Sequence, residues 1–177
     1  MRVYLREATV DDGKYIVKWR NSPSVKSHCF NQNPITEESN RRFFEQHVAT
    51  GNYKQFIVER IEEQYEAVSY PIATVYLKDM DVTNKRCELC IFTSDDCEWN
   101  DESQAIAVRL LLDKAFNEYG MHKVYSYAFV EFLDEAELLK KAGFRVEAIL
   151  NSEALNSRGG YSDAVRFCIF REDFVRS

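Results

Sequence analysis

The stretch AVRLLLDKAFNEYGMHKV, residues Ala107 to Val124, decides the fold class. Its apolar residues recur at helical spacing, and Gly120 follows them as a C-cap, so a helix over about Ser103–Tyr119 is predicted. The next segment, Lys123–Phe129, has the pattern of a strand. A long helix followed directly by a strand indicates a mixed α/β protein.

Working outward from this stretch, the segments before it predict a strand, three helices and an antiparallel meander. Thr9 and Thr36 are suitable N-caps for two of the helices, and a third helix follows Pro23. The expected elements are a strand over Val3–Glu7, helices over Val10–Asn21, from Pro23 to near Phe30 and from Thr36 to Val48, and strands over Tyr53–Ile61, Pro71–Lys78 and Arg86–Thr93.

The segments after the stretch predict one more helix and two more strands. The helix covers about Leu133–Ala142 and ends at a second capping glycine, Gly143. The strands cover Phe144–Leu150 and Tyr161–Phe170, with a turn at Arg158–Gly160 between them. The order β-α-α-β-β-β-α-β-α-β-β is typical of an α/β fold with a mixed sheet.

Composition restricts the class of protein further. The 177 residues are 45% hydrophobic, which fits one domain over residues 1–177 with a sizeable core. A net charge of −6 argues against non-specific nucleic-acid binding. No apolar run approaches the ~20 residues of a membrane span, and the segment MRVYLREATV has a strand pattern rather than that of a signal peptide. We therefore expect a cytoplasmic protein with neither a nucleic-acid nor a membrane partner.

The Cys-x-x-Cys pair at Cys87 and Cys90 is the nearest approach to a metal motif. Both residues lie in an expected strand, where a separation of three places them on opposite faces. No second Cys/His pair at ligand spacing accompanies them. The sequence therefore predicts buried thiols and no metal site.

Five segments together resemble the GNAT superfamily of acyl-CoA-dependent N-acetyltransferases, over nearly the whole chain. They resemble most the branch that contains ribosomal-protein N-terminal, polyamine and nucleotide-amino-sugar acetyltransferases. The segments are WRNSPSV at 19–25, CELCIF at 87–92, AVRLLLDKAFNEYGMHKV at 107–124, LLKKAGFRVEAIL at 138–150 and GGYSDAVRFCIFREDF at 159–174.

The resemblance implies a mixed, mostly antiparallel sheet of about seven strands flanked by about four helices. It implies that the fourth and fifth strands separate and that the pantetheine arm of acetyl-CoA enters the gap. The acceptor amine then attacks the thioester directly, with no covalent enzyme intermediate. The implied acceptor is a primary amine of a small molecule, such as a nucleotide-linked amino sugar, or a peptide N-terminus.

The same resemblance assigns the cofactor-binding residues. Backbone groups near Ile91, Phe92 and Thr93 would bind the pantetheine, and the loop that opens the central helix would wrap the pyrophosphate. In this chain the loop comprises Asn100, Asp101, Glu102, Ser103 and Gln104.

That loop departs from the family pattern. The two family glycines align with Asn100 and Glu102, and Asp101 lies between them. Like charges would oppose phosphate binding, whereas the same side chains would stabilise the helix as caps. The family's acid tyrosine aligns with Leu139, and a cofactor-contacting asparagine aligns with Phe132. The alternative to an enzyme is therefore a catalytically impaired GNAT-fold protein that binds a ligand or partner.

Three residues are the candidates for proton transfer. Glu88 is the expected base, because relatives carry a carboxylate at this point of the fourth strand; otherwise it is an exposed strand glutamate. Tyr125 and Tyr127 lie on one face of the fifth strand, where either would replace the missing tyrosine as acid. The competing interpretation of both is a core aromatic residue.

The acceptor side is expected at two places. Near the N-terminus the candidates are Trp19, Arg20, Asn21 and His28, although Arg20 also suits an ion pair and a lone histidine is often structural. On the last strand the candidates are Tyr161 and Asp163. A purely structural subunit that dimerises through an exposed sheet edge is a third hypothesis, and it leaves a homodimer open.

Overall fold

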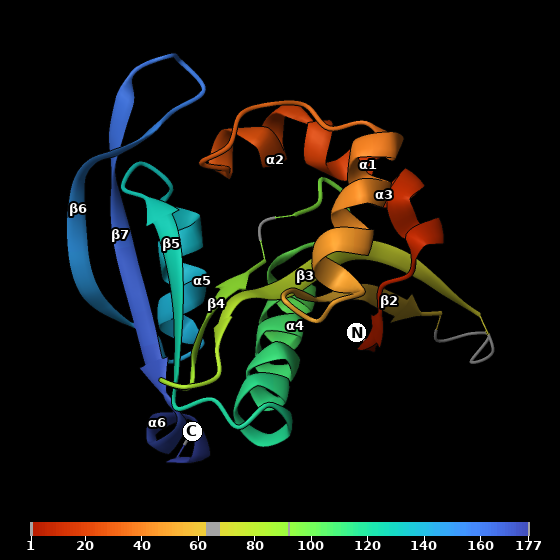
Figure 1. Ribbon diagram of the computed structural model, residues 1–177. Coiled ribbons are helices and arrows are strands. Elements are labelled where there is room, and N and C mark those ends of the chain that lie inside the picture. The colour runs from red at the N-terminus through yellow and green to blue at the C-terminus, as the bar shows by residue number, and fades with distance from the viewer. Residues whose placement is uncertain (1, 63–67, 92, 177) are drawn as a thin grey trace.

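A seven-stranded sheet with the order β1-β2-β3-β4-β5-β7-β6 forms the centre of the computed structural model (Figure 1). The structure describes residues 2–62, 68–91 and 93–176. The strands are β1 (Val3–Glu7), β2 (Lys54–Ile61), β3 (Ser69–Asp81), β4 (Arg86–Cys90), β5 (Lys123–Phe129), β6 (Arg145–Leu155) and β7 (Tyr161–Phe170).

Strand pairing within the sheet is antiparallel except between β4 and β5. That parallel pairing is short, since only Arg86–Glu88 pair with Lys123–Tyr125. On its other side β4 pairs with β3, with one bulge, and β5 pairs with β7 along its whole length. The sheet is therefore open at its middle beyond Glu88 and Tyr125.

The helices divide between the two faces of the sheet. Phe56 and Val58 of β2 belong to the main core with α4, whereas Ile57 between them packs with Ile16 of α1. Successive strand residues point to opposite faces, so α1 and α4 cover opposite faces. Figure 1 shows α1, α2 and α3 grouped together, away from α4 and α5.

Most helix bounds follow from capping and composition. The helices are α1 (Gly13–Asn21), α2 (Pro23–His28), α3 (Glu37–Phe43), α4 (Asp101–Asp113), α5 (Leu133–Lys141) and α6 (Arg171–Arg176). A 3₁₀ turn, Val10–Asp12, precedes α1, and π-helical turns, Phe44–Val48 and Lys114–Glu118, follow α3 and α4. Gly120 and Gly143 adopt positive φ angles of 67° and 95°, which glycine tolerates best.

The predicted fold class and meander are confirmed, and three strands, β1, β5 and β7, have their predicted bounds. β4 is shorter than predicted and ends at Cys90, because β5 diverges from it and no longer provides a pairing partner. β6 is longer and extends to Leu155; it is an exposed edge strand, so its sequence lacks a clear apolar alternation. The C-terminal helix α6 is absent from the sequence prediction.

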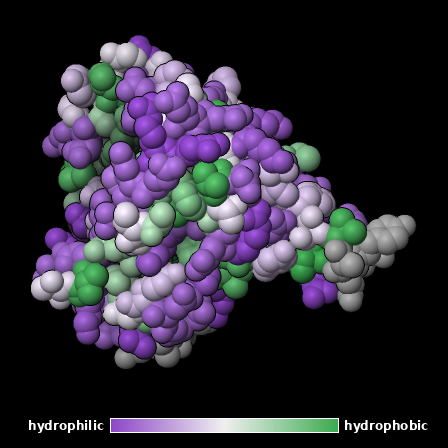
Figure 2. All heavy atoms as spheres, turned by 45° about the vertical axis from the view of Figure 1, so that its right-hand side comes forward, coloured by the Kyte–Doolittle hydropathy of each residue, from purple (hydrophilic) through white to green (hydrophobic). Residues whose placement is uncertain are grey.

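The outer surface offers little continuous apolar area on the face shown in Figure 2, where hydrophobic residues form small separate patches. Large exposed apolar side chains include Val146 and Ile149 on β6 and Leu133 at the start of α5. Among the described residues no helix is long and apolar enough to cross a bilayer.

Candidate active site

The opening between β4 and β5 places Glu88 at a cavity wall. Glu88 is the last residue of β4 that pairs with β5, opposite Tyr125. One residue later the hydroxyl of Ser126 donates a hydrogen bond of 2.8 Å to the carbonyl of Leu89. A side-chain hydrogen bond thus replaces the backbone pairing at the point where the two strands separate. The separation itself is what the resemblance predicts.

A cavity of about 480 Å³ lies over this opening and is called the acceptor cavity below. Its walls come from α1–α3, the loops beside them, strands β2–β5 and the first turn of α5. Among its lining residues are Arg20, His28, Cys29, Phe30, Phe43, Tyr53, Tyr76, Lys78, Glu88, Cys90, Ile91, Thr93, Ser126, Tyr127 and Glu135.

Glu88 is buried rather than exposed, with 8% of its surface accessible. Its carboxylate lies 3.2 Å from Lys78 Nζ, and the Cys90 thiol donates to it at 3.4 Å. Burial raises the pKa of Glu88 above its ordinary value, although Lys78 and Cys90 act in the opposite direction. A carboxylate with a raised pKa holds a proton more readily, which suits a general base.

Cys90 is the nearest thiol to Glu88, but it is poorly suited to act as a nucleophile. Burial and the adjacent Glu88 raise its pKa well above the ordinary thiol value. The thiolate is the reactive form of cysteine, so Cys90 remains a neutral thiol. Cys87 lies on the opposite face in the main core, as its spacing from Cys90 predicted. The site therefore favours direct attack by the acceptor amine.

Tyr125 and Tyr127 lie on one face of β5, as predicted, with ring centroids 5.9 Å apart. The Arg166 guanidinium covers both rings, at 4.2 Å and 5.6 Å. Tyr127 lines the acceptor cavity and Tyr125 does not. Burial raises the pKa of Tyr127, and burial together with Glu88 raises that of Tyr125 to about 12. Both phenols are thus weaker acids than an ordinary tyrosine.

The two candidates on the N-terminal helices that line the cavity are Arg20 and His28. Arg20 Nη2 donates to the carbonyl of Asn31, and Nη1 is buried with no hydrogen-bond partner among the described residues. The His28 ring stacks on Phe132 at 3.8 Å, and its Nδ1 lies 2.8 Å from the carbonyl of Ser24. Arg20 and His28 thus meet Glu88 at one cavity.

Trp19 and Asn21 lie outside both cavities described here. Trp19 is 2% exposed and stacks on Tyr15. The Asn21 amide donates to the Ile35 carbonyl at 2.7 Å and accepts from the Ile35 amide at 2.8 Å. These two residues hold α1 and the loop before α3 in place around Arg20.

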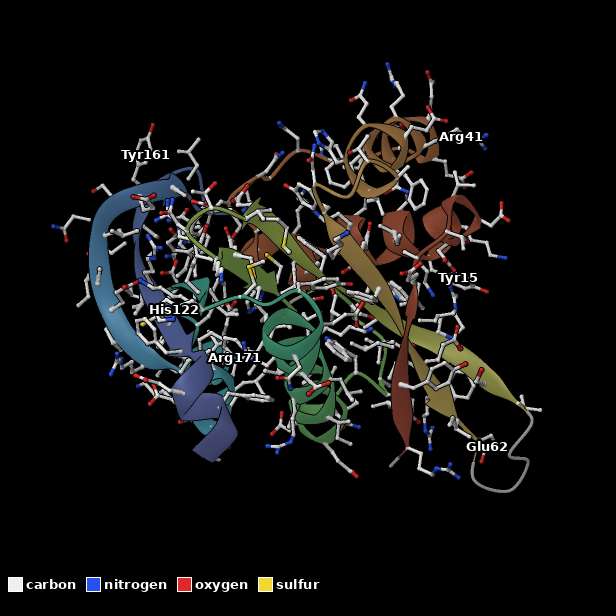
Figure 3. The ribbon with its side chains drawn as sticks, turned by 60° about the horizontal axis from the view of Figure 1, so that its bottom comes forward. Tyr15, Arg41, Glu62, His122, Tyr161 and Arg171 are labelled. Carbon is white, nitrogen blue, oxygen red and sulfur yellow. The ribbon has the colours of Figure 1, made fainter. Side chains whose placement is uncertain are left out.

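Tyr161 and Asp163 also lie away from the acceptor cavity, on β7 of the β6–β7 hairpin. Tyr161 is 68% exposed at the far end of the hairpin (Figure 3). The Asp163 carboxylate accepts a hydrogen bond of 2.7 Å from the Ser152 amide across the hairpin. Both residues thus lie on the hairpin and line neither cavity, so their role in acceptor binding stays a prediction.

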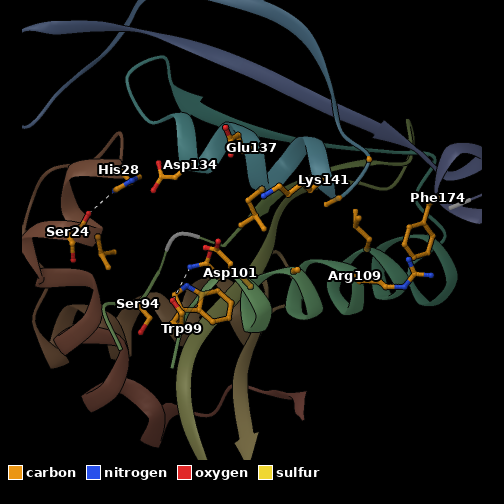
Figure 4. Close-up of a pocket in the computed structure, with 17 residues that line it drawn as sticks. Ser24, His28, Ser94, Trp99, Asp101, Arg109, Asp134, Glu137, Lys141 and Phe174 are labelled. Carbon is orange, nitrogen blue, oxygen red and sulfur yellow. Dashed lines mark hydrogen bonds between the residues drawn. The ribbon is translucent and has the colours of Figure 1, made fainter. Parts of the chain in front are cut away.

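A second cavity, of about 550 Å³, opens between α4 and α5 and is called the cofactor cleft (Figure 4). Asp101, Gln104 and Arg109 line it from α4, and Asp134 and Lys141 line it from α5. His28 lines both cavities, so the cleft and the acceptor cavity meet beside α2. The predicted pantetheine contacts Ile91 and Thr93 line the acceptor side, and Phe92 lies outside the described residues.

The first turn of α4 satisfies its own amide groups. The Asn100 side chain accepts hydrogen bonds from the amides of Glu102 and Ser103, at 3.1 Å and 3.3 Å. In return the Ser103 hydroxyl accepts from the Asn100 amide at 2.9 Å, which completes a capping box. Ser103 is fully buried, and Gln104 donates to the Trp99 carbonyl. The amides of Glu102 and Ser103, which a helix N-terminus could otherwise offer to an anion, are therefore already bonded to the Asn100 side chain.

Other donors in the cleft fit an anionic cofactor. Arg109 and Lys141 line the cleft on opposite sides (Figure 4). Trp99 is 6% exposed and lines the cleft, and its indole N–H has no partner among the described residues. A buried donor without a partner is costly unless a ligand or water satisfies it. These side chains suit the phosphates of acetyl-CoA, although Asp101, Asp134 and Glu137 add opposing charge.

The two other departures from the family pattern are structural here. Leu139 is fully buried in the main core, and Phe132 precedes α5 and stacks on His28. Glu135, one turn before Leu139, is 3% exposed and lines the acceptor cavity. Glu135 is not among the candidates that the sequence indicates, although its spacing from Leu138 and Leu139 places a carboxylate on the apolar face of the helix.

Lys78 is a second missed site residue, and an isolated strand lysine gave no signal of its partner Glu88. No group of three His, Cys, Asp or Glu residues within 2–62, 68–91 and 93–176 is arranged to hold a metal ion.

Solved structures of similar fold include the spermidine N-acetyltransferase from Vibrio cholerae in complex with CoA and spermine. Its TM-score is 0.86 at 21% identity, with 98% of each chain covered. A chimera of that enzyme and hSSAT has a TM-score of 0.86 at 19% identity, with 100% of each chain covered. At these identities the likeness shows the fold alone. No curated protein matches the chain.

A family model described as an acetyltransferase (GNAT) domain matches residues 2–145. The match covers the acceptor cavity, both strands beside the opening and all residues that line the cofactor cleft except Phe174. Proteins with this domain use acetyl-CoA as the acetyl donor and an amine as the acceptor. The chain therefore belongs to the GNAT acetyltransferase family.

Proposed function

We propose that this protein acetylates the primary amine of a small molecule that also carries a negatively charged group, such as a nucleotide-linked amino sugar. The observation that carries the proposal is the charge of the acceptor cavity. Arg20 and Lys78 bring two positive charges to its wall, and Glu88 brings one negative charge. Burial raises the pKa of the remaining acid, Glu135, well above its ordinary value, which disfavours a second negative charge at the wall.

This balance fits an acceptor with an anionic part better than it fits a polycation. A polyamine carries several positive charges, which a wall of net positive charge repels. An acceptor phosphate or carboxylate would instead pair with Arg20, whose planar guanidinium suits such groups. The aromatic residues Phe30, Phe43 and Tyr53 would pack against its ring or carbon chain.

Glu88 would act as the general base of the reaction. It would take a proton from the acceptor amine, directly or through a water molecule, as the amine nitrogen bonds to the acetyl carbonyl carbon. Lys78 would keep the Glu88 carboxylate oriented at 3.2 Å. Acetyl-CoA supplies the acetyl thioester, and Arg109, Lys141 and the Trp99 indole would hold it in the cleft.

The proposal is tested with acetyl-CoA and three acceptors: a nucleotide-linked amino sugar, a dipeptide with a free N-terminus, and spermidine. We expect the anionic amino sugar to have the highest kcat/KM. In an Arg20→Gln variant the kcat/KM for the amino sugar should fall, and that for spermidine should not. A higher kcat/KM for spermidine would contradict the proposed acceptor. Absence of acetyl transfer together with absence of acetyl-CoA binding would favour a non-catalytic binding protein.

A homodimer is a separate proposal that rests on the free edge of β6. This strand ends the sheet and exposes Val146, Ile149 and Leu155. Edge strands with apolar side chains are suited to pairing between copies. Sedimentation of the purified protein would decide it, since a single monomeric species would contradict pairing.

A further inference from the structure

Glu135 is a buried carboxyl group that the proposed function leaves without a role. It is 3% exposed and lies in the first turn of α5, and its Oε2 has no hydrogen-bond partner among the described residues. Natural proteins seldom bury a carboxyl group without a partner, because the loss of hydration is costly. A group of this kind at a cavity wall is a candidate for chemistry.

Glu135 stands where the two cavities meet. It lines the acceptor cavity, whereas its helix neighbours Asp134 and Leu138 line the cofactor cleft. His28 lines both cavities and stacks on Phe132, directly before α5. A thioester that reaches from the cleft to an amine in the cavity must place its sulfur near this boundary.

The position also matches the space that a tyrosine at position 139 would fill. Residues 135 and 139 are one helical turn apart and share one face. Helical side chains lean toward the N-terminus, so the hydroxyl of a tyrosine at 139 would lie over the preceding turn. In this chain residue 139 is a buried leucine without a proton donor, and the preceding turn of the same helix carries the buried carboxyl group of Glu135.

We propose that Glu135 is the general acid that protonates the sulfur of CoA as it leaves, in place of the tyrosine common in the family. The inference rests on the proposed N-acetyltransferase function, and it assigns a residue to a step that function leaves open. Glu135 becomes a catalytic residue that contacts the reacting sulfur, and Leu139 remains a packing residue.

The protonation state agrees with this role. Burial, with a smaller contribution from Asp134, raises the pKa of Glu135 well above its ordinary value, which favours the protonated form of the carboxyl group. The titratable side chains that share its cavity come from α1, α2, the loops after α2 and before β2, and strands β3–β5. They are Arg20, His28, Cys29, Tyr53, Tyr76, Lys78, Glu88, Cys90 and Tyr127.

The proton transfers balance over the reaction. The amine nitrogen bonds to the carbonyl carbon, and its excess proton passes to the Glu88 carboxylate. The carbon–sulfur bond breaks, its electron pair stays on sulfur, and the Glu135 carboxyl gives that sulfur a proton. The products are an amide and a free thiol, and exchange with water returns both carboxyl groups to their starting states.

The first test compares Glu135→Gln with the unmodified protein, using two acetyl donors. With acetyl-CoA we expect kcat to fall by about 10²-fold, the lower end of the usual range for general acid catalysis, at a similar KM. With the acetyl thioester of an aromatic thiol of low pKa the loss should be below about threefold, because such a thiol leaves without a proton. Equal losses with both donors would show that Glu135 is only structural.

The second test asks whether a hydroxyl can replace the carboxyl. Glu135→Ala removes the acid and opens space, and adding Leu139→Tyr to it places a phenol over the same turn. We expect the double variant to recover at least tenfold in kcat over Glu135→Ala alone. Absence of recovery in a folded double variant, judged by circular dichroism, would contradict the shared position.

The third test does not depend on activity. An infrared difference spectrum at pH 7 between the unmodified protein and Glu135→Gln should contain the carbonyl band of a protonated carboxyl group. A carboxylate band in its place would overturn the proposal. If the unmodified protein does not acetylate any amine, the proposed function fails first, whereas an active enzyme unaffected by Glu135→Gln overturns this inference alone.

Discussion

The acceptor cavity and the first turn of α4 differ in how far their polar groups are hydrogen-bonded. In the cavity, Glu88 and Glu135 are buried with raised pKa values, and Oε2 of Glu135 has no hydrogen-bond partner among the described residues. At α4 the Asn100 side chain accepts from two amides, and Ser103 completes the box. The helix end is therefore stabilised by its own side chains, whereas the cavity holds carboxyl groups that suit proton transfer.

The two regions also differ in what replaces the family residues that this chain lacks, the loop glycines and the acid tyrosine. Loss of the loop glycines is compensated within α4, because Asn100 takes over hydrogen bonds that a phosphate would otherwise accept. Loss of the acid tyrosine is not compensated at Leu139, which only packs. We propose that Glu135, one turn away, takes over the role of that tyrosine.

Replacing Glu88, in the acceptor cavity, should have the largest effect on activity. In Glu88→Gln we expect kcat to fall by about 10²–10⁴-fold, since we propose that this carboxylate accepts the proton of the amine. Burial raises the pKa of Glu88, so activity of the unmodified protein should decline as pH falls through a value above that of an ordinary glutamate. The pH profile of kcat/KM measures this limb.

The matched control is Glu172→Gln, which removes an exposed acid on α6. It should leave both kcat and the acid limb unchanged. A Glu88→Gln variant that keeps the same acid limb would assign the base to another residue.

Opening the α4 terminus should have the next largest effect. Asn100→Gly with Glu102→Gly frees two amides and removes one negative charge, at a cost of a few tenths of a kcal/mol in capping. We expect acetyl-CoA to bind about tenfold more tightly, which is about 1.4 kcal/mol. Isothermal titration measures the change.

Glu102→Gln alone separates charge from backbone access, because it keeps Asn100 as the cap. It should account for the smaller part of the gain. If the double variant binds acetyl-CoA no better than the unmodified protein, the phosphates do not lie at this helix end.

The smallest expected effect concerns the cations of the cofactor cleft. Lys141→Gln should weaken acetyl-CoA binding by about threefold at low salt, and the loss should shrink as salt screens the charge. Lys140→Gln is the control, because this neighbour does not line the cleft. Equal losses in the two variants would indicate a general charge effect and no direct contact.

Much of the fold was predictable because it depends on local patterns. The bounds of β5 and β7 follow from their apolar runs, and the turns at Gly120 and Gly143 follow from residues that tolerate positive φ angles. The end of β4 was not predictable, because it depends on the separation of β5. The extension of β6 to Leu155 was not predictable either, because an exposed edge strand lacks apolar alternation.

The site was predictable only in part. Glu88, Arg20, His28 and Tyr127 were candidates that the structure brings to one cavity. Trp19 and Asn21 instead support the residues around Arg20, and Tyr161 lies exposed on the hairpin. Family motifs record both packing and chemistry, and a linear pattern does not separate the two.

Local patterns were enough to predict the α/β class, the order of elements, the GNAT resemblance and the acidic start of the central helix, because propensity, periodicity and caps act over a few residues. The three-dimensional arrangement was needed to find that Glu88 is buried beside Lys78, that Asn100 accepts hydrogen bonds from the amides of α4, and that Glu135 lies where two cavities meet. These properties depend on burial and on partners distant in sequence, and burial sets the pKa of a carboxyl group.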